Sequence, residues 1–132
     1  MVAGLAAGCG AAGPEGWPEG RPRVERLAFV DQKPQAPSSL LFEVDFVDAD
    51  GDLGAGAVEL GTRGGTRSRL SMEDVYEAQF PPLAQTATAG RLALYVELGR
   101  RARVGERVTV ELVLEDGAGR RSNRPSVTLE AR

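Results

Sequence analysis

The residues best suited to chemistry form one acidic run, Asp48-Ala49-Asp50-Gly51-Asp52. Carboxylates at every second position around a glycine offer several oxygen ligands within a tight turn, which is what a hard cation such as Ca²⁺ requires. Asp and Gly are also ordinary turn formers, because an Asp side chain can hydrogen-bond the backbone N–H groups that follow it. The run therefore leaves two interpretations open, a calcium site and a plain turn.

An EF-hand explains the run poorly, although Glu59 stands at the twelfth position counted from Asp48. An EF-hand loop requires Gly at its sixth position, where this chain has Leu53, and it requires flanking helices. The residues before Asp48 alternate as in a strand. We therefore expect Glu59 to point outward from a strand, between inward Val58 and Leu60.

The composition argues against catalysis. The chain of 132 residues contains no His and one Cys, which excludes imidazole chemistry, histidine-ligated zinc and an internal disulfide. A carboxylate pair could act without His, but we expect the acidic run to be an exposed, Gly-rich loop with nothing apolar nearby to raise a pKa. The Gly-rich segment 61–67 lacks the Lys of a phosphate-binding loop. The sequence therefore predicts a protein that is not an enzyme.

The charge of the chain makes nucleic acid an unsuitable partner, because the formal net charge is -3 and no basic excess is present. Arginines gather in two predicted loops that should lie at opposite poles of the domain. These are Arg100, Arg101 and Arg103 in one loop and Arg120, Arg121 and Arg124 in the other. Each cluster is either a solvated loop or a binding site for an anionic surface polymer.

The N-terminus contains the single cysteine of the chain. Residues 5–9 read LAAGC and are similar to a bacterial lipobox, in which a signal peptidase cuts before a Cys that then carries lipid. The resemblance implies lipidation of Cys9 and attachment to the membrane on the extracytoplasmic side of a bacterial envelope. We interpret residues 1–9 as a truncated lipoprotein signal, 10–22 as a flexible Gly/Pro linker and 23–132 as the folded domain.

From Arg23 onward the apolar residues recur with a period of two, which predicts strands with one buried face. The clearest strands are 40–47, 91–98 and 107–115, and weaker ones are 24–30, 57–62, 67–71 and 126–130. One short helix is expected within residues 72–80, ended by Pro81-Pro82. Seven short strands separated by glycine-containing turns predict an all-β, seven-stranded antiparallel sandwich.

Two loop sequences carry a family resemblance, DADGDLG at residues 48–54 and DGAGRRSN at residues 116–123. They are similar to loops of the immunoglobulin-like and cadherin-like sandwich domains of bacterial surface lipoproteins. In an immunoglobulin-like sandwich the loops after the second, fourth and sixth strands cluster at one pole. The expected cation ligands at that pole are Asp48, Asp50, Asp52, Asp116 and Asn123, with Glu73, Asp74 and Glu77 nearby.

Two classes of function follow. The chain is either a lipid-anchored structural or adhesion-type module or an accessory domain. Ca²⁺ bound at the acidic run would make the structural module rigid. The accessory domain would bind a protein, peptide or glycan through its loops or a sheet edge. We expect Tyr76 and Tyr95 to be exposed and to add contact area.

Overall fold

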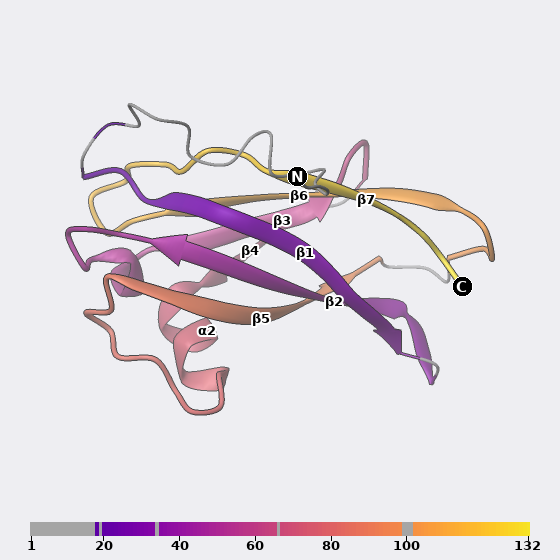
Figure 1. The fold of residues 1–132 in the computed structure, drawn as a ribbon, viewed down its shortest axis with the longest axis horizontal. Helices are drawn as coiled ribbons and strands as arrows, with labels where there is room; N and C mark the ends of the chain where they lie inside the picture. Colours follow the sequence, from indigo (N-terminus) through magenta and orange to yellow (C-terminus); the bar gives the residue numbers. More distant parts are fainter. Residues whose placement is uncertain (1–17, 19, 34, 66, 99–101) are drawn as a thin grey trace.

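The computed structural model of the chain describes residues 18, 20–33, 35–65, 67–98 and 102–132. The predicted lipidation residue Cys9, most of the predicted linker, Arg100 and Arg101 lie outside the described residues. Within them the chain forms two antiparallel sheets that pack face to face (Figure 1). The first sheet has the order β1-β2-β5, formed by β1 (Arg23–Lys33), β2 (Ala36–Val47) and β5 (Ala89–Glu97). The second has the order β4-β3-β6-β7, formed by β4 (Arg67–Ser71), β3 (Ala57–Thr62), β6 (Arg107–Glu115) and β7 (Ser126–Glu130).

The core lies between the sheets and is built from the alternating apolar positions of the sequence. Every inward side chain expected on β2 and β6 is buried, and so are those that β3 and β5 direct inward. These residues are Leu40, Phe42, Val44, Phe46, Val58, Leu60, Leu92, Leu94, Val96, Val108, Val110, Leu112 and Leu114. The side-chain period of two thus places one face of each strand in the core, as predicted.

Two of the edge strands, β1 and β4, have weaker sequence patterns for physical reasons. In β1 the buried apolar positions are Val24 and Leu27, which have odd spacing because the register with β2 shifts between Val24 and Arg26. Such a shift moves the following side chains to the other face of the strand. All five residues of β4 are exposed, so its sequence carries no buried face to recognise.

The all-β sandwich is therefore confirmed, with all seven predicted strands present. The fourth strand, β4, pairs with β3 and belongs to the four-stranded sheet. In a constant-type immunoglobulin domain the fourth strand lies beside the fifth instead. The immunoglobulin-like relationship remains a prediction.

The helix α2 (Met72–Ala78) is the short helix that the sequence predicts before Pro81-Pro82. Ser71 caps its N-terminus by accepting a hydrogen bond from the Asp74 N–H. Its apolar face consists of Met72, Val75 and Tyr76, and Tyr76 stacks on Phe46 with ring centroids 6.0 Å apart. The expectation that Tyr76 is exposed is wrong, because the helical period turns it onto the same face as Met72. Tyr95, on the outer face of β5, is 44% exposed as expected.

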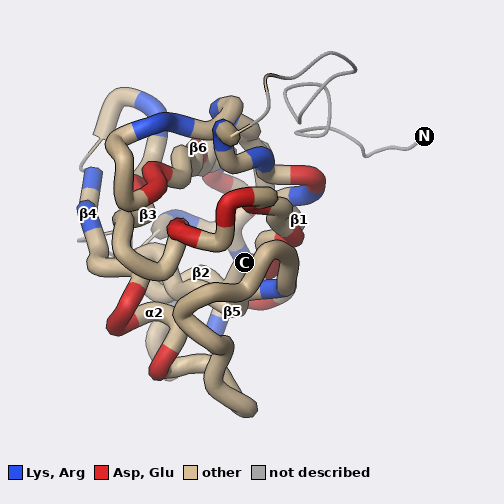
Figure 2. The backbone as a smooth tube through the Cα atoms, turned by 90° about the vertical axis from the view of Figure 1, so that its left-hand side faces the viewer, with Lys and Arg blue, Asp and Glu red and all other residues tan. Residues whose placement is uncertain are grey.

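Three loops meet at one end of the sandwich, which we call the loop pole and define as residues 48–56, 79–88 and 116–125. The Asp48 N–H donates to the Thr88 carbonyl at 2.7 Å, and the Gly117 N–H donates to the Asp52 carbonyl at 3.0 Å. These contacts confirm that the loops after the second, fourth and sixth strands cluster. Figure 2 looks onto this pole, where acidic segments lie close to basic ones.

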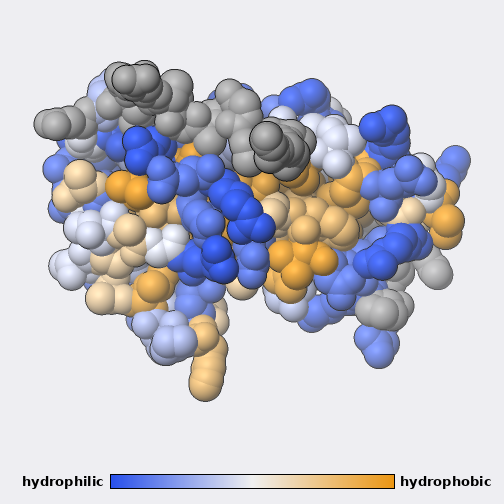
Figure 3. Space-filling view, viewed as in Figure 1, coloured by the Kyte–Doolittle hydropathy of each residue, from blue (hydrophilic) through white to orange (hydrophobic). Residues whose placement is uncertain are grey.

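The outer faces of the two sheets are polar and held by ion pairs. On the first sheet Arg91 donates to Asp45 at 2.7 Å, and Arg26 lies within 4 Å of Asp45 and Glu43. Figure 3 shows hydrophilic residues in a band across the face seen in Figure 1, with hydrophobic residues on either side. Ion pairs thus lie on the outer face of the first sheet, and the apolar core lies between the sheets, as in an antiparallel sandwich.

Candidate metal centre

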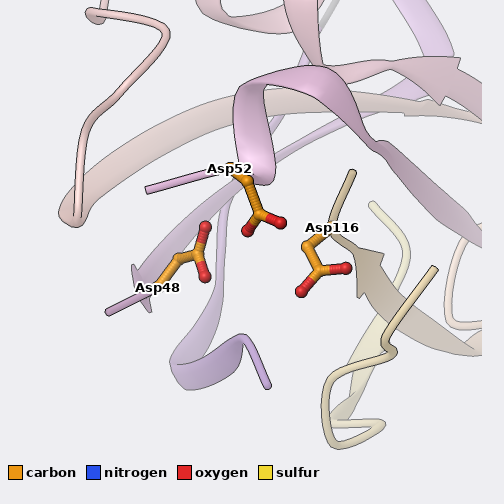
Figure 4. A group of neighbouring side chains, drawn as sticks. All are labelled: Asp48, Asp52 and Asp116. Carbon is orange, nitrogen blue, oxygen red and sulfur yellow. The ribbon is translucent and has the colours of Figure 1, made fainter. Parts of the chain in front are cut away.

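Three carboxylates of the loop pole lie close enough together to hold a metal ion. Asp48, Asp52 and Asp116 each offer one oxygen, and these oxygens all lie within 4.8 Å of one another. Figure 4 shows the three side chains directed into a common space, two from the loop after β2 and one from the loop after β6. The site thus joins a loop of one sheet to a loop of the other.

The turn that follows β2 fixes the position of Asp48. The Gly51 N–H closes this turn on the Asp48 carbonyl at 3.0 Å, and Gly51 has a φ of +67°, which favours glycine. Asp48 Oδ2 accepts a hydrogen bond of 2.7 Å from the Leu53 N–H. Leu53 is fully buried at the start of the 3₁₀ helix η2 (Leu53–Ala55) and anchors the loop in the core.

A second turn positions Asp116 directly after β6. Its Oδ1 accepts hydrogen bonds from the N–H groups of Ala118 at 3.0 Å and Arg120 at 2.8 Å. The sequence DGAGR thus folds back on its leading Asp, which is the turn chemistry that the sequence left open. The turn interpretation is therefore correct for one oxygen of Asp48 and one of Asp116, and it does not account for the rest of the cluster.

The carboxylates of Asp48 and Asp52 each keep one buried oxygen without a partner. Among the described residues, no hydrogen-bond donor reaches Asp48 Oδ1 or Asp52 Oδ1. Asp48 is 0% exposed, and burial is the main cause that raises the pKa of its carboxyl group, with the charge of Asp52 adding to it. The expectation of an exposed loop with nothing to raise a pKa is therefore wrong for Asp48, which lies near the buried residues Leu53 and Tyr76, whereas Asp50 is exposed as expected.

Arg120 is the residue of this site that the sequence interpretation missed. Its guanidinium contacts three carboxylates: Nη2 lies 2.7 Å from Asp50 Oδ2 and 3.5 Å from Asp52 Oδ2, and Nε lies 2.9 Å from Asp116 Oδ2. Arg120 follows Asp116 by four residues in a Gly-rich turn, and this acid-to-base spacing is the signal that could have identified it. Asp50 is held by Arg120 and is not one of the three clustered carboxylates.

Asn123 lies at the same pole but has a different role. Its Oδ1 accepts from the Val24 N–H at 2.8 Å, and its Nδ2 donates to the Val24 carbonyl at 3.0 Å. Both residues are buried, so this amide ties β1 to the loop before β7. Glu73, Asp74 and Glu77 are exposed on α2 and do not belong to the carboxylate group.

Arg121 also has acidic partners, in a closed ring on the outer face of the second sheet. It contacts Glu59 at 2.8 Å and Glu115 at 3.1 Å, and Arg69 contacts the same two carboxylates at 2.8 and 2.7 Å. Glu59 thus points outward as expected. The hydrogen bond from Arg121 is the main cause that lowers the pKa of Glu59, to about 2. Arg120 and Arg121 are therefore parts of ion-pair networks rather than solvated loop residues.

A shallow groove of about 120 Å³ lies away from the loop pole, where the edges of the two sheets face each other. Strands β3 and β4 form one wall and β5 forms the other. The lining residues are Leu60, Gly61, Ser68, Leu70, Tyr95, Val96 and Glu97. Leu70 and Tyr95 are partly exposed there, so the groove is open to solvent.

In the part of the chain that the structure describes, no helix is long and apolar enough to cross a membrane. Comparisons of the chain with models of protein families, with curated proteins and with solved structures gave no match.

Proposed function

We propose that the chain is a non-catalytic module of a bacterial cell envelope whose loop pole binds Ca²⁺ through Asp48, Asp52 and Asp116. The observation that supports this most strongly is the buried Oδ1 of Asp48, which has no hydrogen-bond partner in the described part of the chain and lies beside two further carboxylates. A buried carboxylate oxygen without a partner is unfavourable, and a cation at this position would stabilise it.

The dimensions of the cluster accommodate calcium. Calcium binds oxygen at about 2.3–2.6 Å, so two ligands on opposite sides of the ion lie about 4.8 Å apart. The three carboxylate oxygens fall within that span. Magnesium at about 2.1 Å demands a tighter and more regular shell. The Asp52 side chain is 32% exposed, which leaves room for water to complete the coordination.

A cation at this position would act as a clamp between the sheets. Asp48 and Asp52 follow β2 of the first sheet, and Asp116 follows β6 of the second. The ion would therefore hold together two loops that belong to different layers, and it would remove the repulsion among their carboxylates. The result would be a rigid module, which suits a structural or adhesion-type role outside the cell.

Thermal unfolding of the full chain in EDTA and in millimolar Ca²⁺ tests the proposal. A ligand that binds only the native state at about 100 times its Kd adds roughly 2.7 kcal/mol of stability, so the melting temperature should rise clearly. Asp48→Asn and Asp52→Asn should each abolish the rise, and Asp74→Asn, an exposed acid on α2, should keep it. The absence of a rise in the unmodified chain would overturn the calcium site.

We propose further that lipid on Cys9 anchors the module, on the strength of the LAAGC sequence. When the chain is expressed in a bacterium behind a complete signal, it should partition into the detergent phase and incorporate a labelled fatty acid. Cys9→Ser should leave it in the aqueous phase without label. Equal partitioning of the two forms would contradict lipid anchoring.

The groove favours a second candidate function, the capture of an acidic extended peptide along β4. Strand β4 is a fully exposed sheet edge, which a peptide strand can join through its backbone. Arg63, Arg67 and Arg69 beside it are 39–63% exposed, whereas their partners Glu59, Glu111 and Glu115 are 14–24% exposed. The cationic surface disfavours a second copy of β4 and favours acidic residues in the partner.

A fluorescent peptide that alternates Glu with Val is a suitable probe for this edge. Its anisotropy should rise on titration with the chain, and Leu70→Lys should weaken the binding because Leu70 lines the groove. Val104→Lys, a change at a residue that is 85% exposed and is not among the groove residues, should leave binding unchanged. Equal binding by both variants, or binding of anionic glycans alone, would overturn the peptide site.

A further inference from the structure

We infer that Arg120 acts as a built-in competitor for the cation: its guanidinium must leave the loop pole before Ca²⁺ can bind, so Arg120 sets the affinity of the site. This inference rests on the proposed function and assigns to Arg120 the regulation of that site. It does not depend on which partner the module meets.

The competition follows from the contacts of the guanidinium. Arg120 Nε lies 2.9 Å from Asp116 Oδ2, and Nη2 lies 3.5 Å from Asp52 Oδ2. Asp116 Oδ1 is already engaged by two backbone N–H groups, so Oδ2 is its oxygen with capacity for a metal. The guanidinium therefore occupies ligand capacity on two of the three clustered carboxylates.

The charges at the pole explain why an exchange would be favourable. Asp50, Asp52 and Asp116 contact a single guanidinium, and Asp48 lies beside Asp52 and Asp116. Among the described residues, Asp48 Oδ1 and Asp52 Oδ1 lack donors. One positive charge thus neutralises the group incompletely. A divalent cation carries twice that charge, and it can contact the buried Asp48 carboxylate, for which no contact with Arg120 is found.

The exchange needs only a side-chain movement. The turn that carries Arg120 is held by backbone groups, since the Asp116 N–H donates to the Arg120 carbonyl at 2.9 Å and the Arg120 N–H donates to Asp116 Oδ1. The side chain of Arg120 is 39% exposed and can turn outward into water. On the other side, the Arg120 guanidinium packs against Gly20, where an added Cβ would lie 2.5 Å from Nη1. The side chain can therefore move only toward solvent.

Two matched variants of the full chain test the inference. Arg120→Gln removes the charge and keeps much of the length, and Arg124→Gln makes the same change at an exposed position of the same loop. We expect Arg120→Gln to lower the melting temperature in EDTA and to lower the Kd for Ca²⁺, measured by calorimetric titration, by at least about tenfold, the weight of one charge-assisted hydrogen bond. Arg124→Gln should leave the Kd within about twofold, since rim charges contribute little.

The outcomes separate this inference from the proposed function. If the unmodified chain and Arg120→Gln bind Ca²⁺ with equal Kd, the inference is overturned and the calcium site stands. If neither binds, the calcium site itself is wrong and the inference falls with it. Binding by Arg120→Gln alone would uphold the competition at the three carboxylates, and it would overturn Ca²⁺ binding as a property of the native chain. If Arg120→Gln fails to fold, Arg120→Lys, which loses the two-armed contact, should give a Kd below that of the native chain, and an unchanged Kd would overturn the inference.

Discussion

The hydrogen bonds between Asn123 and Val24 make a stability prediction that can be worked out from the structure. Removing the amide in Asn123→Ala leaves the N–H and the C=O of Val24 without their partner, and Val24 is 0% exposed. Each buried backbone group that loses its partner costs about 1–3 kcal/mol, and water that enters the vacated space recovers part of this. We expect Asn123→Ala to lower the free energy of unfolding by about 2–4 kcal/mol.

Urea unfolding followed by circular dichroism measures this loss, with Gln35→Ala as the control. Gln35 is an exposed amide in a turn, so its truncation should change stability by less than about 0.5 kcal/mol. Asn123→Ala also separates the two roles considered for Asn123, a structural amide and a metal ligand. As a structural amide it should not alter the stabilisation by Ca²⁺, whereas a metal ligand would abolish it. A loss below about 1 kcal/mol for Asn123→Ala would refute the reasoning.

Asn123→Asp adds a pH test of the same geometry. One carboxylate oxygen can accept from the Val24 N–H, but the other then faces the Val24 carbonyl, which lies 3.0 Å from Nδ2 in the native chain. The folded state should therefore favour the protonated acid and raise its pKa above the unfolded value of about 3.9. The deficit of Asn123→Asp relative to the native chain should shrink as the pH falls from 7 toward about 4, because the folded state binds the extra proton. A deficit that stays constant would contradict this account.

Three further predictions concern the rest of the fold. Acid should destabilise the domain by breaking the ring of Glu59, Glu115, Arg69 and Arg121. The pKa values of both glutamates are lowered in the folded state, that of Glu59 to about 2. Their ion pairs therefore stabilise the fold at neutral pH, and this stabilisation is lost as the pH falls below about 4.5. Glu59→Gln should cost about 1–2 kcal/mol at pH 7 after solvent screening and flatten the acid limb of the stability profile, and an unchanged limb would count against the ring. Gly56→Ala should lower the free energy of unfolding in urea by about 3 kcal/mol, because its Cβ would overlap the Glu115 carbonyl. Gly64→Ala has open space but a φ of +75°, so it should lower the free energy of unfolding by about 1–2 kcal/mol. Equal losses for the two variants would contradict this. Tyr76→Phe should be neutral or stabilise by up to about 1 kcal/mol, because the buried hydroxyl has no hydrogen-bond partner among the described residues, and a loss above 1 kcal/mol would reveal a partner.

The sequence predicted the strands well because their information is local. Alternating runs such as 107–115 specify both the strand and its buried face, and even the weak strands 57–62, 67–71 and 126–130 have the observed bounds. The glycine-containing turns between them fixed the lengths of the connections. The loop pole also followed from topology, since an antiparallel sandwich with seven strands must bring alternate loops to the same end.

The residues of the site could be predicted only in part, because some candidate ligands form hydrogen bonds or ion pairs with other residues of the chain. Asp48, Asp52 and Asp116 do meet. Asp50 is taken by Arg120, and Asn123 is taken by Val24 of β1, a residue 99 positions away. The burial of Asp48 could not be predicted from the sequence around it either. It depends on Tyr76 of α2, a helix that lies more than twenty residues further along the chain.

The tie between Val24 and Asn123 also has a consequence for the order in which the domain assembles. The β1–β2 hairpin can pair as soon as both strands exist, but Val24 of β1 gains its hydrogen bonds with Asn123 only when the loop before β7 has docked. Closing so long a segment of chain is entropically costly and belongs late on the folding pathway. Loss of the amide should therefore accelerate unfolding and leave the folding rate nearly unchanged, so that the contact governs how long the folded domain persists rather than how fast it forms.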